Sequence, residues 1–536
     1  MRLHTLIYTL LLGPLMAANA VAADARPNIL LIVADDLGYS DLGAFGGEIS
    51  TPNLDKLAAT GLQLTSMYAA PTCSPTRAML MSGTDNHLAG LGTMEEALQP
   101  FQRGKPGYEG YLNQQAHSIA QLLKDGGYST SMVGKWHLGL EPEQGPDRRG
   151  FQHSFSMLEG GASHFKPAVL NPTKVEQVHY RENGQAVELP EDFYSTDFYT
   201  DKLITYLRES QQSGQPFFAY AAYTSPHWPL QAPDAYLDKY QGRYDQGYDD
   251  IRLARIERMQ KLGLLAEDFQ PANLVPANPK LPRWDQLSVE QRKTEARKME
   301  IYAAMVDNLD HNIGRLLDHL RQSGQLDNTL IVFMSDNGAA GEAHTQFYPA
   351  GPHTDNSYEN LGRPGSQIDY GTRWAEVSAA PFRLFKGTTA EGGIIVPAIV
   401  QLPKRMQRQG LETLAAAVMR RFLPYLCPKG ETGLRARIIF ALLLVVVSKL
   451  IQLSMAWVYG QAIDRMVPGM EDSVAIAIAL VAAYAGARFG GVLFDNLRNV
   501  VFERVGQEAT RRLAENVFSH LHNLSMRFHM NRRTGA

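Results

Sequence analysis

The sequence lacks the features that define several protein classes. It has only two cysteines, Cys73 and Cys427, in 536 residues, which excludes a fold held by a disulfide framework. Its 46 glycines and 29 prolines follow no fixed period, which excludes collagen-like and simple repeat structures. The net charge of -4 provides no overall basic field, so we expect no nucleic acid as a partner. No Gly-x-x-x-x-Gly-Lys-Ser/Thr motif occurs, so we expect no ATP site in this chain.

What is present is ordinary globular composition, with 44% hydrophobic and 20% charged residues. The N-terminus has a positive residue, Arg2, and then an apolar run from Leu6 to Ala18 that is too short to span a bilayer. Small residues at Ala20 and Ala22 offer a cleavage site. Residues 1–23 therefore read as a signal peptide that exports the following domain to the periplasm; the alternative is a buried N-terminal helix or strand.

Residues 26–403 alternate apolar strand-like runs with helical patterns, which indicates an α/β domain with a largely parallel sheet flanked by helices. Two buried strands, 28–34 and 329–334, are followed by the polar pairs Asp35-Asp36 and Asp336-Asn337. Ligands gather at the carboxyl ends of parallel strands, and clustered carboxylates need a cation to neutralise them. Oxygen ligands favour Ca²⁺ or Mg²⁺. The alternative is that each pair caps a helix or turn.

A cysteine begins the next motif, at the start of a helical pattern. Pro75 suits a first helical turn, and Arg77 follows Cys73 by one turn on the same face. Because helix N-termini favour anions, Cys73 is placed to meet an anionic group beside a fixed cation. The alternative is a buried structural cysteine.

The segment 73–77, Cys-Ser-Pro-Thr-Arg, resembles the Cys-x-Pro-x-Arg signature of the type I sulfatases of the alkaline phosphatase superfamily. The likeness covers residues 26–403 and is nearest to bacterial arylsulfatases. Further segments match that family in order and character: Asp35-Asp36, 127–137, Ser225-Pro226-His227, Asp336-Asn337-Gly338, and Lys386 with the following Glu391-Gly392-Gly393. Six motifs in the family's order make the likeness specific.

The resemblance implies a modified nucleophile and a metal site. A formylglycine-generating enzyme would convert Cys73 to formylglycine, whose hydrate attacks the sulfur of a small-molecule sulfate ester. Ca²⁺, with Mg²⁺ as the alternative, would be held by an oxygen of modified Cys73 and by four further side chains: Asp35, Asp36, Asp336 and Asn337.

The same resemblance implies roles for five other residues. Arg77 would orient the formylglycine, and Lys135 and Lys386 would hold the sulfate oxygens. His227 would protonate or stabilise the leaving oxygen. His137 would take a proton from the second hydroxyl, so that sulfate is expelled and the aldehyde regenerated. Taken singly, Lys135 fits a surface charge, His137 a helix cap and His227 a packed loop residue equally well.

The stretch from Leu287 to Gln322 has apolar residues at helical spacing. Its charged residues, including Asp307, Asp310 and His311, are expected on a solvated side of that helix.

The pattern changes near Pro403. A basic juxtamembrane segment covers 404–437, and two apolar runs follow, 438–460 and 473–494, each long enough to cross a membrane. Lys449 and Arg488 interrupt these runs, so buried soluble helices are the alternative. We expect an all-α segment with two transmembrane helices that attaches the chain to a membrane.

Residues 438–536, especially 518–535, resemble the start of an ABC exporter transmembrane domain of the heavy-metal and mitochondrial iron–sulfur type. The positive-inside rule places both flanks of the apolar runs in the cytoplasm, which conflicts with an exported first domain. The small C-terminal sheet of the sulfatase family has no counterpart after residue 403. These features predict a fusion of two unrelated segments and reduced stability.

Three functions follow as alternatives. The first is hydrolysis of sulfate esters by an arylsulfatase. The second is a phosphodiester or phosphonate monoester hydrolase of the same superfamily. The third is an ABC exporter membrane-domain fragment fused to an inactive sulfatase.

Overall fold

The computed structural model describes residues 26–169, 171, 178–271, 280–343 and 350–407, with six isolated positions further along the chain. The chain divides into two compact units, Met1–Met406 and Gln407–Ala536. The predicted signal peptide, both apolar runs and most of the basic segment lie outside the described residues. Among the residues that are described, no helix is long and apolar enough to cross a membrane.

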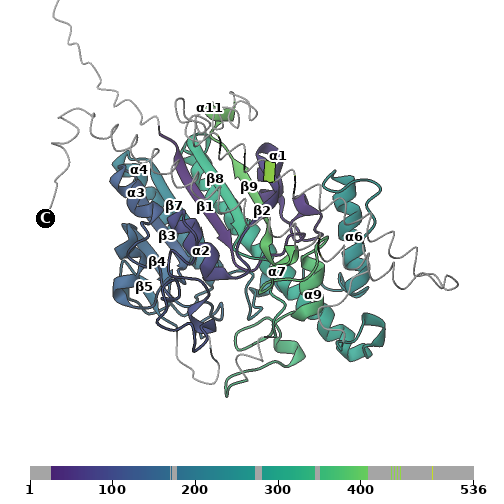
Figure 1. Ribbon diagram of the computed structural model, residues 1–536. Helices are drawn as coiled ribbons and strands as arrows, with labels where there is room; N and C mark the ends of the chain where they lie inside the picture. The colour runs from purple at the N-terminus through teal and green to yellow at the C-terminus, as the bar shows by residue number, and fades with distance from the viewer. Residues whose placement is uncertain are drawn as a thin grey trace, which may run out of the picture. The chain divides into compact units, whose positions relative to one another are not determined.

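A nine-stranded sheet forms the centre of the first unit, in the order β2-β9-β8-β1-β7-β3-β4-β5-β6 (Figure 1). The strands are β1 Asn28–Ala34, β2 Leu62–Tyr68, β3 Ser129–Lys135, β4 His153–Met157, β5 Tyr180–Glu182, β6 Gln185–Ala186, β7 Phe217–Ala222, β8 Thr329–Ser335 and β9 Ile395–Gln401. The central strands β8, β1, β7, β3 and β4 pair in parallel, whereas β2, β9, β5 and β6 pair antiparallel at the two sides. This confirms the predicted largely parallel sheet.

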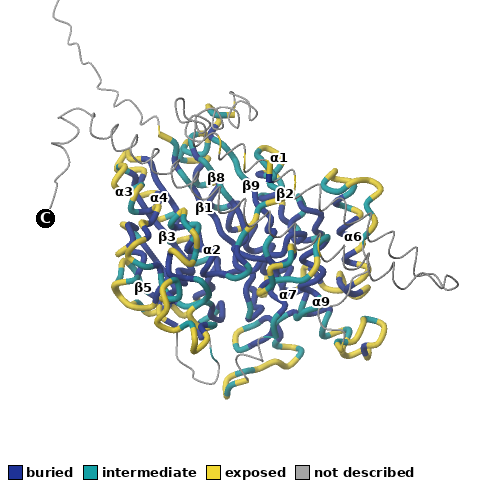
Figure 2. The backbone as a smooth tube through the Cα atoms, viewed as in Figure 1, coloured by how far each residue is buried: buried dark blue, intermediate teal, exposed yellow. Residues whose placement is uncertain are grey.

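Helices cover both faces of the sheet. They are α1 Pro52–Thr60, α2 Cys73–Ser82, α3 Ile119–Asp125, α4 Ser195–Ser213, α5 Asp234–Leu237, α6 Tyr248–Lys261, α7 Val289–Gln322, α9 Gly371–Ser378, α10 Glu391–Ile394 and α11 Lys404–Gln407. Side chains alternate along β1, so Leu30 and Ile32 join one core with α1, α4 and α7, while Leu31 and Val33 join a second core with α2 and α3. The central strands β1, β3 and β7 are therefore almost entirely buried, dark blue in Figure 2, whereas β2 at the side of the sheet is partly exposed.

The long helix α7 corrects one expectation. Asp307 and Asp310 are buried rather than solvated, with 6% and 1% of their surface exposed, whereas His311 is exposed. Asp310 accepts hydrogen bonds from the backbone amides of Asn53 and Leu54 at 3.1 and 2.8 Å. Asp310 thereby satisfies free N–H groups at the start of α1. The helical pattern of 287–322 alone did not predict this contact.

Candidate active site

The polar residues that follow β1 and β8 meet at one edge of the sheet. These strands are parallel neighbours, and Ala34 is in register with Ser335, so the residues after them lie side by side. The Asp36 amide donates to Asp336 Oδ1 at 3.3 Å, and Asn337 Nδ2 donates to Asp36 Oδ1 at 2.6 Å. All the residues of the two pairs are buried: Asp35, Asp36, Asp336 and Asn337.

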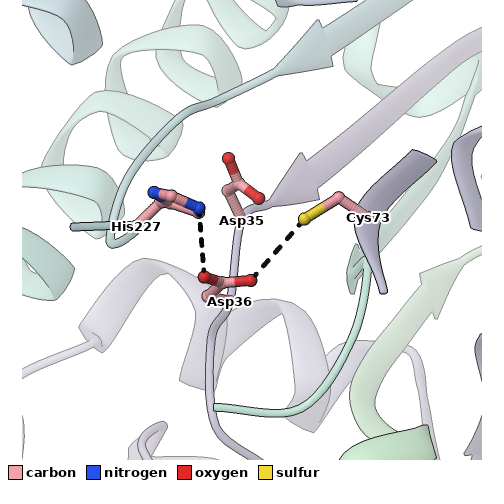
Figure 3. Close-up of side chains that lie close together, drawn as sticks. All are labelled: Asp35, Asp36, Cys73 and His227. Carbon is pink, nitrogen blue, oxygen red and sulfur yellow. Dashed lines mark hydrogen bonds and ion pairs between the residues drawn. The ribbon is translucent and has the colours of Figure 1, made fainter. Parts of the chain in front are cut away.

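Helix α2 brings the cysteine and the arginine to this edge. Cys73 is the first residue of α2 and is 1% exposed, and its Sγ lies 3.9 Å from Asp36 Oδ1 (Figure 3). One turn later, Arg77 donates to Asp336 Oδ2 from Nε at 2.9 Å, and its Nη2 lies 2.7 Å from the same oxygen. The guanidinium therefore neutralises a carboxylate of the cluster from the same helix that carries the cysteine.

Burial affects the thiol strongly. It raises the pKa of Cys73 well above its usual value, although Lys135 and Lys386 oppose the shift. An unmodified Cys73 is therefore protonated at neutral pH, and a protonated thiol is a poor nucleophile.

Two buried lysines complete the charge balance. Lys135, the last residue of β3, donates to both carboxylate oxygens of Asp35 at 2.9 Å. Lys386 donates to Asp36 Oδ2, also at 2.9 Å. Burial favours the uncharged lysine, but Asp35 and Asp36 outweigh it and raise the pKa of their respective partners, Lys135 and Lys386. Both ammonium groups therefore stay charged in a site where an anion would be held.

His227 faces the cluster from the loop after β7. Its Nδ1 lies 2.6 Å from the Trp228 carbonyl, and its Nε2 lies 3.4 Å from Asp36 Oδ2 (Figure 3). Lys386 Nζ is 3.5 Å from the same ring nitrogen. Burial lowers the pKa of His227 well below its usual value, despite the opposing charge of Asp36. The ring is neutral at pH 7, with Nε2 turned towards the charged groups.

His137 lies two residues beyond the end of β3. Its Nε2 is 3.1 Å from Glu96 Oε1 and 3.2 Å from Glu96 Oε2. With Cys73, His227 and Lys386, His137 lines a cavity of about 210 Å³. The predicted motifs therefore all bring residues to one edge of the sheet. Four of these residues line one cavity: Cys73, His137, His227 and Lys386.

The oxygen donors of the site fit a hard divalent cation, whereas the Cys73 sulfur and the His227 nitrogen are softer donors. Ligand atoms from Asp35, Asp36, Cys73 and His227 lie within 4.8 Å of one another. The sequence did not propose His227 as a ligand, and Asp336 is outside this tight group, with its Oδ2 held by Arg77. Among the residues that the structure describes, the buried side-chain oxygen of Asn337 has no hydrogen-bond partner, which suits a cation ligand.

The comparison with known families decides the identity of the first unit. Residues 27–419 match the sulfatase family. The chain belongs to the sulfatase family. This sulfatase is 42% identical over 387 residues to the arylsulfatase of Klebsiella aerogenes, covering 71% of this chain and 82% of that enzyme. It is 47% identical over 402 residues to an uncharacterised sulfatase of Schizosaccharomyces pombe, covering 72% of each chain.

The remainder of the sulfatase chain has a different relationship. Residues 438–536 match the ABC transporter transmembrane region. They lie in a stretch that is 51% identical over 135 residues to the ATM1-type heavy metal exporter of Novosphingobium aromaticivorans, covering 25% of this chain. The chain spans only 21% of that exporter's length. Both resemblances read from the sequence are thus confirmed.

Several residues near the site were not found by sequence reasoning. Glu96 contacts His137, Glu342 lines the cavity, and the Tyr220 hydroxyl accepts from Arg77 Nη1 at 3.4 Å. None of them belongs to a motif, and each reaches its partner only through folding, so spacing along the chain gave no signal.

Proposed function

We propose that this sulfatase hydrolyses aryl or alkyl sulfate esters through Cys73 converted to formylglycine, with Ca²⁺ bound beside it. Overall, water adds across the ester S–O bond and yields an alcohol or phenol and hydrogen sulfate. The observation that carries the proposal is the buried position of Cys73 at the start of α2, 3.9 Å from Asp36 and among fixed cations. A hydrated aldehyde at this position would supply the attacking oxygen that the protonated thiol does not.

The metal would be held by the oxygen atoms of Asp35, Asp36, Asp336 and Asn337 and by residue 73, with Mg²⁺ as the alternative ion. Bound there, the ion supplies positive charge to the sulfate oxygens and to the attacking oxygen. The three carboxylates already attract Arg77, Lys135 and Lys386, which supports a site that can hold both a cation and an anion.

The other residues act on charge and protons. Lys135 and Lys386 hold the sulfate oxygens and stabilise negative charge as the S–O bond breaks. Arg77 holds residue 73 in position through their shared helix and through Asp336. His227, with Lys386 beside its Nε2, protonates or stabilises the leaving oxygen. His137 accepts a proton from residue 73 when sulfate departs.

The C-terminal region gives the chain a second property. Its match to the ABC transporter transmembrane region indicates membrane association. We propose that residues 404–437 flank two membrane-spanning helices within 438–536, and that the sulfatase domain is exported. A formylglycine-generating enzyme is the required partner for the conversion of Cys73.

Turnover of matched esters tests the proposal. The full chain, produced with a formylglycine-generating enzyme, is assayed with 4-nitrophenyl sulfate, with the corresponding phosphodiester and with a phosphonate monoester. We expect sulfate release that Cys73→Ala abolishes, with little change in the thermal midpoint because only the small polar group of residue 73 is lost. Turnover of the phosphorus esters alone would reverse the assignment, and no turnover of any ester would favour an inactive domain fused to an exporter fragment.

A further inference from the structure

The ring of His137 is held from one side only. Glu96, in a short 3-10 turn at Glu95–Ala97, places both carboxylate oxygens within 3.2 Å of Nε2. The other ring nitrogen, Nδ1, is buried and has no hydrogen-bond partner among the described residues. Because a carboxylate only accepts hydrogen bonds, the proton of a neutral His137 belongs on Nε2 and the lone pair on Nδ1.

The residues around His137 and Glu96 keep these two side chains in contact. A side chain at Gly160 would place its Cβ 2.7 Å from His137 Cε1 and 2.9 Å from Glu96 Oε1, so only a glycine leaves room for the contact. His137 itself has a φ of 54°, and its amide donates to the Leu158 carbonyl at 3.2 Å. The histidine is thus fixed through its backbone, and Glu96 and Gly160 define the place of its ring.

The geometry also suits a permanent charge on Glu96. Its side chain is 47% exposed at the rim of the cavity, whereas that of His137 is 7% exposed. Partial burial opposes ionisation, but the attraction to the protonated form of His137 and the hydrogen bond from its ring outweigh it and lower the pKa of Glu96 to about 2. The carboxylate is therefore available to His137 throughout the neutral range.

We propose that Glu96 is a positioning residue that fixes the Nε2–H tautomer of His137 and leaves Nδ1 as the acceptor. The inference rests on the proposed function, in which His137 takes a proton from a hydroxyl of residue 73, which lines the same cavity. The proton moves from that oxygen to Nδ1, the electron pair of the broken O–H bond forms the C=O bond of the aldehyde as the C–O bond to sulfate breaks, and the proton then passes to water. The adjacent carboxylate stabilises the imidazolium that forms.

Three substitutions separate this role from a structural one. Glu96→Leu removes the acceptor, while Glu96→Gln keeps a carbonyl oxygen that can still accept from Nε2–H. Glu143→Gln is the matched control, because Glu143 is exposed and does not line the cavity. We expect Glu96→Leu to lower kcat about 10- to 100-fold with an almost unchanged KM, Glu96→Gln to have an intermediate kcat, and Glu143→Gln to match the wild type.

The order of product release gives a kinetic readout. Breaking of the ester bond does not require His137, whereas release of sulfate does. Rapid mixing of Glu96→Leu with 4-nitrophenyl sulfate should therefore show a burst of about one nitrophenolate per active site, followed by slow turnover. A uniformly slow reaction with no burst would contradict the assigned step.

The tautomer provides a readout that needs no turnover. Nitrogen-15 NMR of histidine-labelled full chain, with His137 assigned by a His137→Gln variant, should show Nε2–H in the wild type and in Glu96→Gln. In Glu96→Leu we expect the Nδ1–H form to appear. A wild-type ring protonated on Nδ1, or a Glu96→Leu variant with unchanged tautomer and kcat, would overturn the inference. If the wild type hydrolyses no sulfate ester, the proposed function fails, while the NMR result still decides whether Glu96 fixes the ring.

Discussion

Asp36 links four parts of the site. Its carboxylate accepts from Lys386 and Asn337 and lies close to Cys73 and His227. Its φ of 66° places it in the left-handed region, which a non-glycine residue adopts at a cost of about 1–3 kcal/mol. Burial would raise its pKa, but the charges around it, that of Lys386 foremost, outweigh burial and lower it, so Asp36 stays ionised. A charged, strained carboxylate at a strand end is what a cation site needs.

The unpaired oxygen of Asn337 leads to a prediction about metal affinity. Asn337→Ala removes that oxygen and the hydrogen bond from Nδ2 to Asp36. We expect Ca²⁺ affinity to fall about 10- to 100-fold, measured by isothermal titration calorimetry on the full chain. Asn360→Ala, at a partly exposed residue that does not line the cavity, serves as the control and should bind Ca²⁺ like the wild type. Equal affinity in the two variants would remove Asn337 from the ligand set.

Among individual residues, the sequence predicted the site best where a motif directly follows a strand or begins a helix. Asp35, Asp36, Asp336 and Asn337 could be placed together because β1 and β8 were recognisable as buried strands. Their roles as ligands stay a prediction. Glu96 could not be found, because its contact with His137 depends on how the loops before β3 and after it fold onto each other.

At the scale of elements, β3 shows how the backbone positions a functional side chain. Gly134 has a φ of 95°, and a Cβ there would lie 1.9 Å from the Ala222 carbonyl of β7. The two strands therefore approach closely just before Lys135. A glycine is required at this position because any side chain would push the strands apart.

Gly134→Ala should therefore impair both folding and activity. We expect a loss of more than about 2 kcal/mol in the free energy of unfolding, together with reduced turnover because Lys135 moves. Gly214→Ala is the matched control: its φ is 68° but nothing lies within 4 Å of the added Cβ, so only about 1 kcal/mol of backbone strain is expected. Denaturant unfolding of both variants checks the difference, and equal losses would contradict it.

The loop after β1 is tied to α6 by a buried ion pair. Arg255 donates to Glu48 from Nε at 2.8 Å and from Nη2 at 2.7 Å, and it also pairs with Asp41. Burial raises the pKa of Glu48, but Arg255 outweighs burial and lowers it from 4.5 to about 2. The loop that starts at the candidate metal site is thus held in place by buried ion pairs.

This pair predicts a pH dependence of stability. Because the pKa of Glu48 is lowered on folding, its contribution is present above pH 4.5 and is lost as the pH falls towards about 2. At about 1.4 kcal/mol per pH unit, that contribution is about 3 kcal/mol. The difference in free energy of unfolding between wild type and Glu48→Gln should therefore shrink by this amount from pH 6 to pH 2. A difference independent of pH would show that Glu48 does not titrate as assigned.

The helices were harder to predict in detail than the strands. The apolar spacing of 287–322 indicated α7, whose observed bounds are Val289–Gln322. The expectation that Asp307 and Asp310 are solvated was wrong, because periodicity describes one helix and cannot show which neighbours cover its polar side. Here Tyr240 and the start of α1 supply the partners.

At the scale of the whole molecule, two unrelated families share one chain. All described contacts of the site come from residues between Asp35 and Lys386, within the unit Met1–Met406. The ABC transporter match begins at residue 438. The described contacts of the site thus belong to the first unit, and a boundary near residue 403 stays a prediction.

Truncation tests this separation. A chain ending after Gln407 should hydrolyse sulfate esters with the same kcat as the full chain, measured per formylglycine. Residues 404–536 expressed alone should sediment with membranes and release no sulfate. An inactive truncated chain beside an active full chain would show that the C-terminal region completes the site.

The most direct test of the central claim is mass spectrometry of the peptide that contains Cys73, from chain produced with a formylglycine-generating enzyme. Conversion of the thiol to an aldehyde lowers the peptide mass by about 18 Da, and a carbonyl reagent should label residue 73. We expect this conversion in the active protein, in proportion to its turnover. An active protein whose Cys73 remains an unmodified thiol would contradict the account.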